Sequence, residues 1–167
     1  MQETWEAVAR TLVDEFSDLG DVEQVTQLVL RLLLAAVLGG LLGLQRERPG
    51  KPAGIRTHML VAASSALIVV VPLQNGMGDD ALARVIQGLL AGVGFVCAGA
   101  ILKLEREETI HGLTTAAGVW MTSAIGIAAG LGREMTAALS TLLVLGILAL
   151  EAPIRRFGVG QDARPED

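Results

Sequence analysis

Residues 25–45 read VTQLVLRLLLAAVLGGLLGLQ, and residues 46–56, which follow directly, read RERPGKPAGIR. The first stretch is long and apolar enough to cross a hydrocarbon core of roughly 30 Å, which takes about 20 helical residues. The second is a compact basic segment, of the kind that flanks membrane spans on their cytoplasmic side. This alternation of apolar run and basic connector predicts an integral membrane protein. The overall 51% of hydrophobic residues would not, because soluble domains have a similar content.

Four further apolar windows follow the first one, over residues 57–74, 84–103, 112–131 and 134–151. The window at 112–131 is the least apolar because it contains Thr114, Thr115, Thr122 and Ser123, so a buried helix of a soluble protein is its alternative interpretation. Taken together, the windows predict an all-α integral membrane protein with about five transmembrane helices.

The connectors between these windows differ in charge, and this difference predicts the orientation. One side carries eight basic residues, namely Arg46, Arg48, Lys51, Arg56, Lys103, Arg106, Arg155 and Arg156. The other side has only Arg84 and Arg133 near the ends of the spans, with Asp79 and Asp80 in the connector. Because Lys and Arg accumulate in cytoplasmic loops, we expect a cytoplasmic C-terminus and, with five spans, an N-terminus outside.

The chain divides into three parts on this interpretation. In residues 1–24, apolar side chains recur at helical spacing among acidic ones, which predicts an extracytoplasmic amphipathic helix that lies on the membrane or on the bundle, with Trp5 as its anchor. Residues 25–157 form the five-helix transmembrane domain. Residues 158–167 are polar, and we expect them to be a disordered cytoplasmic tail.

Most of the 20 glycines fall within the predicted spans, and several are spaced as GxxxG. Helices in lipid associate by close packing, which small residues allow. The pattern therefore predicts helix packing or a partner interface at Gly39, Gly43, Gly88, Gly92, Gly99, Gly126 and Gly130. Packing within one chain, a homodimer and an interface with another membrane protein all stay open, because each of them needs backbones that approach closely.

Polar residues at the basic ends of the spans form a second candidate site, which we call the rim. It consists of Arg46, Glu47, Arg56, Thr57, His58, His111, Thr114 and Thr115. Cations at helix N-termini are disfavoured by the helix dipole, so they need an anion such as Glu47 or a phosphate nearby. The threonines are candidates to cap the same helix ends. The alternative is that the basic residues only set the topology and contact lipid headgroups.

Recognisable catalytic and metal-binding motifs are missing from the sequence. Cys97 is the single cysteine, and His58 and His111 are each alone on their segments. No serine or cysteine nucleophile has an identifiable base, so we expect a protein that is not an enzyme. We predict no cofactor. Mg²⁺ binding stays open as an alternative, although no motif supports it. Nucleic acid is not an expected partner, whereas membrane lipid is.

Four motifs, in this order, resemble the MgtC/SapB family. They are GLxRE at residues 43–47, AGxRTH at 53–58, GxGFxxAG at 92–99 and GLTTAAxxW at 112–120. The resemblance covers about residues 31–156. It implies a bacterial inner-membrane protein linked to magnesium limitation and, in pathogens, to survival inside macrophages. It also implies regulation of membrane partners such as the F-type ATP synthase or a P-type magnesium ATPase.

The sequence departs from this family pattern at three places. Gln45 stands where members commonly carry Glu, which weakens any site that needs two carboxylates there. His111 stands where another basic residue usually precedes GLTTAA. Longer members also continue into a soluble C-terminal domain after the fifth span, so we expect the function of that domain to be absent.

Three functions remain in competition at this point. The leading one is a non-enzymatic membrane regulator or accessory protein of magnesium homeostasis, which acts by binding another membrane protein. The second is a transporter of Mg²⁺ or another small solute, which the lack of carboxylates deep in the spans disfavours because Mg²⁺ is held by oxygen ligands. The third is a lipid- or phosphate-binding protein that uses the rim.

Overall fold

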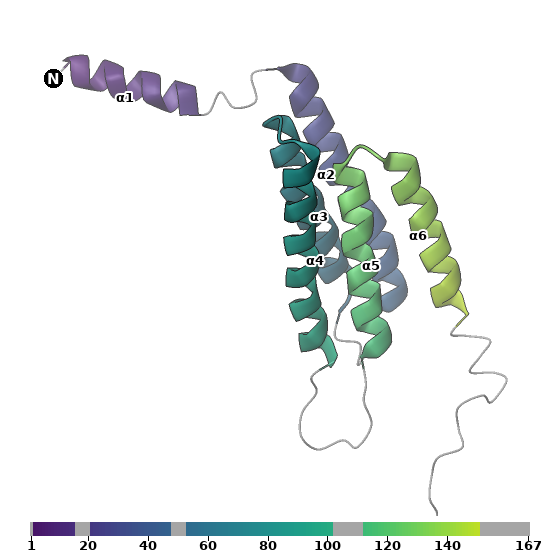
Figure 1. Cartoon of the computed structure of the whole chain (residues 1–167). Coiled ribbons are helices and arrows are strands. Elements are labelled where there is room, and N and C mark those ends of the chain that lie inside the picture. The colour runs from purple at the N-terminus through teal and green to yellow at the C-terminus, as the bar shows by residue number, and fades with distance from the viewer. Residues whose placement is uncertain (1, 16–20, 48–52, 102–111, 151–167) are drawn as a thin grey trace, which may run out of the picture. The chain divides into compact units, whose positions relative to one another are not determined.

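The computed structural model describes residues 2–15, 21–47, 53–101 and 112–150, and over these ranges its regular elements are all helices joined by short turns (Figure 1). The helices of these ranges are α1 (Gln2–Glu15), α2 (Val22–Arg46), α3 (Ile55–Gln74), α4 (Asp79–Ile101), α5 (Leu113–Gly130) and α6 (Glu134–Ala149). The predicted tail at 158–167 and the 48–52 and 102–111 connectors lie outside these ranges. The all-α class is confirmed.

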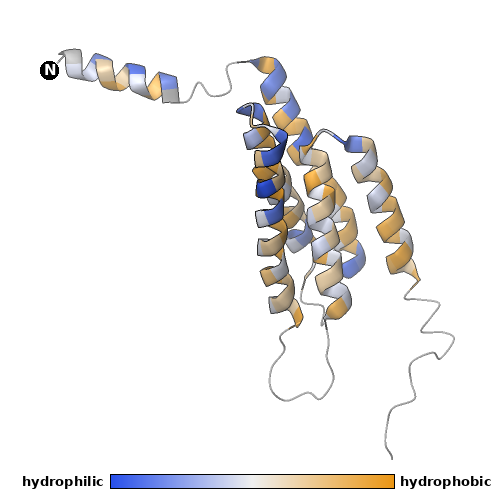
Figure 2. Ribbon diagram, viewed as in Figure 1, coloured by the Kyte–Doolittle hydropathy of each residue, from blue (hydrophilic) through white to orange (hydrophobic). Residues whose placement is uncertain are grey.

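The chain separates into two compact units, residues 1–30 and residues 31–167. In the second unit, α3 to α6 lie side by side with the remainder of α2 (Figure 1). Four helices, α2 to α5, are long and apolar enough to cross a membrane. The fifth predicted span is α6, an apolar helix of only 16 residues. Hydrophobic residues cover most of the length of these helices, and the most hydrophilic residues lie mainly toward helix ends (Figure 2).

Helix α5 lies at the centre of the second unit, where it packs against α3, α4 and α6. Within the bundle, 61% of the α5 span is buried, against 17% of the α4 span. This explains why the window at 112–131 is the least apolar of the five. Thr115, Thr122 and Ser123 are buried against neighbouring helices rather than exposed to lipid. Their hydroxyls lower the hydropathy of the window without placing polar groups in the hydrocarbon.

The buried hydroxyls are satisfied by hydrogen bonds. The Thr122 hydroxyl donates to the Gly118 carbonyl over 2.8 Å, and that of Thr141 donates to Ala137 over the same distance. The Ser65 hydroxyl donates to the Val61 carbonyl over 2.7 Å. Its oxygen also lies 2.8 Å from the Ser123 hydroxyl of α5, which joins α3 to α5 in the membrane interior.

Four of the predicted interface glycines mark close approaches between helices. A Cβ at Gly39 of α2 would lie 2.5 Å from the His58 carbonyl oxygen, and one at Gly43 would overlap the Ile55 backbone. A Cβ at Gly126 of α5 would lie 2.9 Å from the Ala62 Cα, and one at Gly130 would lie 2.7 Å from the Ala66 carbonyl oxygen. Helix α3 is therefore held between α2 and α5 by backbone contact on both sides.

Candidate functional site

The rim lies where several helix ends meet. Helix α2 ends at Arg46 and α3 begins at Ile55, while α5 begins at Leu113. The end of α4 belongs to the same region, because a Cβ on Gly112 would overlap the Ala100 carbonyl oxygen. Gly112 also has a φ of 97°, so glycine is required there for conformation as well as for space.

Arg46 is the most enclosed charged residue of the rim, with 2% of its surface exposed. Its Nη2 donates to the Thr114 carbonyl oxygen of α5 over 3.2 Å. The guanidinium also lies at the C-terminal end of α2, where the helix dipole favours positive charge. Arg46 thus links the end of α2 to the first turn of α5.

Glu47 interacts with a different helix. Its Oε2 accepts a hydrogen bond from the Ile55 backbone N–H over 2.6 Å, at the first residue of α3. A carboxylate at this place satisfies an N–H that has no partner inside the helix and is favoured by the dipole. The Glu47 side chain also lies against Gly54, where a Cβ would overlap it. The anion expected beside the start of α3 is therefore supplied by Glu47.

His58 is buried in the second turn of α3, with 1% of its surface exposed. Its Nδ1 lies 2.9 Å from the Gly54 carbonyl oxygen. Because a carbonyl only accepts, Nδ1 carries the proton and donates. In the neutral ring Nε2 is then the acceptor, and it faces Gly118 of α5, where a Cβ would lie 3.7 Å away.

The other predicted rim residues are less closely involved. Arg56 and the Thr114 side chain are exposed, Thr57 is half-buried, and Thr115 is buried. His111 lies outside the described residues. The expectation that the threonines cap these helices is wrong, because Gly54 and Gly112 occupy the N-cap positions and no side chain there makes a capping bond. The threonines lie inside the first turns, two or three residues past the N-cap positions.

Two polar residues inside the bundle have roles that the sequence pattern did not reveal. The Arg31 Nη1 donates to the Gly130 carbonyl at the end of α5 over 3.1 Å. Beyond that end, Gly132 with a φ of 71° and Arg133 donate back to Ala129 and Ala128, which completes a Schellman-type ending. The sequence signal for this role was the presence of an arginine among leucines in an apolar window, since a charged residue there needs a polar partner within the bundle.

Gln45 is the second such residue. Its Nε2 lies 3.5 Å from the Leu145 carbonyl oxygen of α6. Its Oε1 is buried and accepts no hydrogen bond from any residue that the structure describes. The residue that departs from the family pattern thus faces α6 rather than the rim groups of α3 and α5.

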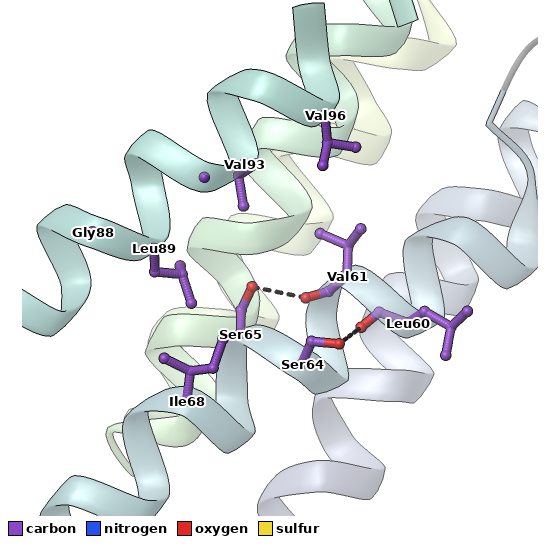
Figure 3. Close-up of a pocket in the computed structure, with 10 residues that line it drawn as sticks. Leu60, Val61, Ser64, Ser65, Ile68, Gly88, Leu89, Val93 and Val96 are labelled. Atoms are coloured by element: carbon purple, nitrogen blue, oxygen red, sulfur yellow. Dashed lines mark hydrogen bonds between the residues drawn. The ribbon is translucent and has the colours of Figure 1, made fainter. Parts of the chain in front are cut away.

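The glycines of α4 differ from those of α2 and α5. A Cβ at Gly88, Gly92 or Gly99 would have no atom within 4 Å outside its own helix. Next to Gly88 and Gly92, a groove of about 540 Å³ runs between α3 and α4. Apart from the hydroxyls of Ser64 and Ser65, its lining is apolar, and both hydroxyls bond to carbonyls of α3 (Figure 3).

The carboxylates of the second unit stand at helix ends in the described ranges. They are Glu47, Asp79, Asp80 and Glu134. Within those same ranges, no three His, Cys, Asp or Glu side chains are grouped as a metal site would require. Cys97 is buried, and its Sγ donates to the Ala116 carbonyl over 3.2 Å.

The chain is similar in sequence to several bacterial proteins. It is 45% identical to protein SrpB of Synechococcus elongatus over 130 residues, which are 71% of each chain. It is 39% identical to a protein of Escherichia coli named "Putative magnesium transporter YhiD", over 72% of this chain and 60% of that one. It is 34% identical to protein MgtC of Salmonella typhimurium, over 76% of this chain and 54% of that one.

The chain thus spans little more than half the length of several relatives. No solved structure matches it. The MgtC family matches residues 32–157, which include α3 to α6 and most of α2. Together with the apolar helices, this match identifies a multi-pass protein of the bacterial inner membrane. The chain belongs to the MgtC family.

Proposed function

We propose that this protein is a non-enzymatic regulator or accessory protein of magnesium homeostasis and of adaptation to low magnesium, and that it acts by binding another membrane protein. The observation that carries the proposal is the open glycine face of α4, at Gly88, Gly92 and Gly99. The glycine pairs of α2 and α5 pack against the backbone of α3 within the chain. The glycines of α4 have no such contact, and Gly88 and Gly92 lie beside the groove between α3 and α4.

The groove suits a transmembrane helix of a partner. Helices in lipid associate where small residues let backbones come close, and Gly88 and Gly92 provide such a place one turn apart. Both serine hydroxyls of the lining are already bonded within α3, so a partner needs no polar group to satisfy them. An apolar helix packed along α4 would fill the groove of Figure 3.

The F-type ATP synthase and a P-type magnesium ATPase are the partner candidates that the family resemblance implies. In this proposal the rim keeps the bundle in shape on the cytoplasmic side. Arg46 ties α2 to α5, and Glu47 ties the end of α2 to the start of α3. These contacts fix the position of α3 relative to α2 and α5. Because α3 forms one wall of the groove, the rim would also influence the shape of the groove.

The alternative function is transport of Mg²⁺ or another small solute, which the name of YhiD favours for that relative. The positions of the described carboxylates support the regulator instead. They lie at helix ends, whereas Mg²⁺ crossing a bundle needs oxygen ligands that replace part of its water.

A pull-down with a matched control tests the regulator. We expect Gly92→Leu to abolish stoichiometric co-purification of the ATP synthase or the magnesium ATPase from membranes of cells grown at low magnesium. Gly146→Leu should retain it, because Gly146 of α6 is also open but lies away from the groove. A Cβ at either position has no atom within 4 Å outside its own helix, so neither substitution overlaps the described chain at its first carbon. Equal co-purification of the partner with both variants would show that the partner does not bind at the glycine face of α4.

A flux assay tests the alternative. Purified protein in liposomes is expected to produce no Mg²⁺ flux above that of empty liposomes. Glu47→Gln is the variant for comparison, because glutamine keeps an oxygen that can accept the Ile55 N–H. Robust flux that disappears in this variant would overturn the regulator in favour of a transporter.

A further inference from the structure

The first unit carries an apolar helix face that has no cover in the described structure. Helix α1 places Trp5, Val8, Ala9, Leu12 and Val13 on one side at spacings of three and four residues. Trp5 is 73% exposed and Val13 is 71% exposed, although both are large apolar side chains. Burying such a stripe is what stabilises a short helix, because propensity alone rarely suffices.

We propose that this face of α1 docks onto lipid, at the boundary between headgroups and acyl chains on the side of the membrane where α2 begins. The helix then lies in the plane of the membrane surface, as amphipathic interfacial helices do. This inference goes beyond the proposed function and does not depend on it, because it concerns only the first unit.

Two features favour lipid over a protein partner. Tryptophan is enriched at membrane–water interfaces, where its ring contacts apolar groups while the indole N–H reaches polar ones. In addition, only residues 16–21 separate α1 from α2. A chain of that length spans at most about 25 Å, so α1 stays close to the membrane surface and its docking is effectively intramolecular.

The charges of α1 specify which lipid surface it fits. By helical spacing, Arg10 and Asp14 lie on the side opposite Trp5, and Glu6 lies at the edge of the apolar face. Their orientation leaves them in water when the apolar face is buried. Because the helix is acidic overall, anionic headgroups repel it, and a zwitterionic surface suits it best.

Tryptophan fluorescence of the whole protein tests the proposal, because Trp5 and Trp120 are the only two tryptophans. The Trp120→Phe variant is placed in phosphatidylcholine vesicles with or without brominated acyl chains. We expect Trp5 emission to be quenched by the brominated lipid and largely protected from aqueous acrylamide. Adding phosphatidylglycerol at low salt should increase acrylamide quenching. The Trp5→Phe variant reports on Trp120 and shows whether the bundle is unchanged.

Two neighbouring substitutions provide the matched control. Leu12→Glu puts a charge on the apolar face and should increase acrylamide quenching of Trp5 several-fold. Thr11→Glu adds the same charge on the other face and should change it little. Free access of acrylamide to Trp5 in the parent protein would overturn the proposal. Protection from acrylamide without quenching by brominated lipid would also overturn it, since Trp5 would then be covered by protein.

Discussion

Arg46 and Glu47 are neighbours in the chain, yet each contacts a different helix. Arg46 is buried and donates to the Thr114 carbonyl of α5. Glu47 turns to the backbone N–H of Ile55 at the start of α3. The pair therefore fixes two helices relative to the end of α2, and the two interactions can be tested separately.

Arg46→Met should lower the free energy of unfolding by about 1–3 kcal/mol, because a buried hydrogen bond from a charged group is lost while the aliphatic part of the side chain is kept. Unfolding in mixed detergent micelles measures this. Arg56→Met is the control, since Arg56 is exposed in the next helix and should change stability by no more than about 0.5 kcal/mol. Equal losses for the two variants would contradict the role of Arg46.

Glu47→Ala should cost about 0.5–2 kcal/mol of stability, as does the loss of other caps at helix N-termini. Glu47→Gln should cost less, because it keeps an oxygen acceptor and loses only the charge. Faster amide hydrogen exchange at Ile55 in the alanine variant would locate the effect at the start of α3. Unchanged exchange at Ile55 would show that the carboxylate is not its partner.

Helices α4 and α5 illustrate what glycine spacing means at the scale of elements. Both contain a GxxxG pair, but Gly126 of α5 lies against the Ala62 backbone while Gly92 of α4 lies in the open. The spacing predicted close packing at both places. It could not separate packing within the chain from an exposed face, because small residues serve both.

Gly126→Ala should therefore lower the free energy of unfolding by about 1–3 kcal/mol, since the added methyl group overlaps backbone that cannot move aside easily. Gly92→Ala should leave stability unchanged or slightly higher, because alanine is the better helix former. The two variants are compared in the same detergent unfolding experiment. A large loss from Gly92→Ala would mean that the Gly92 face of α4 is packed against another part of the chain.

The whole molecule has an orientation in the membrane that the basic connectors predict. In that orientation the 75–78 connector lies outside and the start of α3 is cytoplasmic. Single cysteines introduced in a Cys97→Ser background test it. A membrane-impermeant maleimide should label Met77→Cys in intact spheroplasts and Arg56→Cys only after permeabilisation. Serine suits position 97 because its hydroxyl also donates to the Ala116 carbonyl. The reverse labelling pattern would invert the topology.

By itself, the sequence determined the helical class, the approximate bounds of the spans and the family, because apolar length and ordered motifs are properties of the chain read in one dimension. The start of α4 was predicted five residues late, since Asp79 and Asp80 are polar and yet favoured in a first helical turn. Single-residue roles were harder to predict. The carboxylate of Glu47 takes the place expected for threonine caps, and Arg31 bonds to the end of α5 across the bundle.

Only the tertiary structure decided which helix is central and which face is free. The window with the lowest hydropathy became α5, the most buried of the four long spans, because hydropathy measures suitability for lipid and α5 faces protein. The GxxxG glycines of α2 and α5 were assigned to internal contacts, and Gly88 and Gly92 of α4 to an open groove. These outcomes depend on which surfaces meet, and helix–helix contacts join residues far apart in the chain that no local pattern pairs.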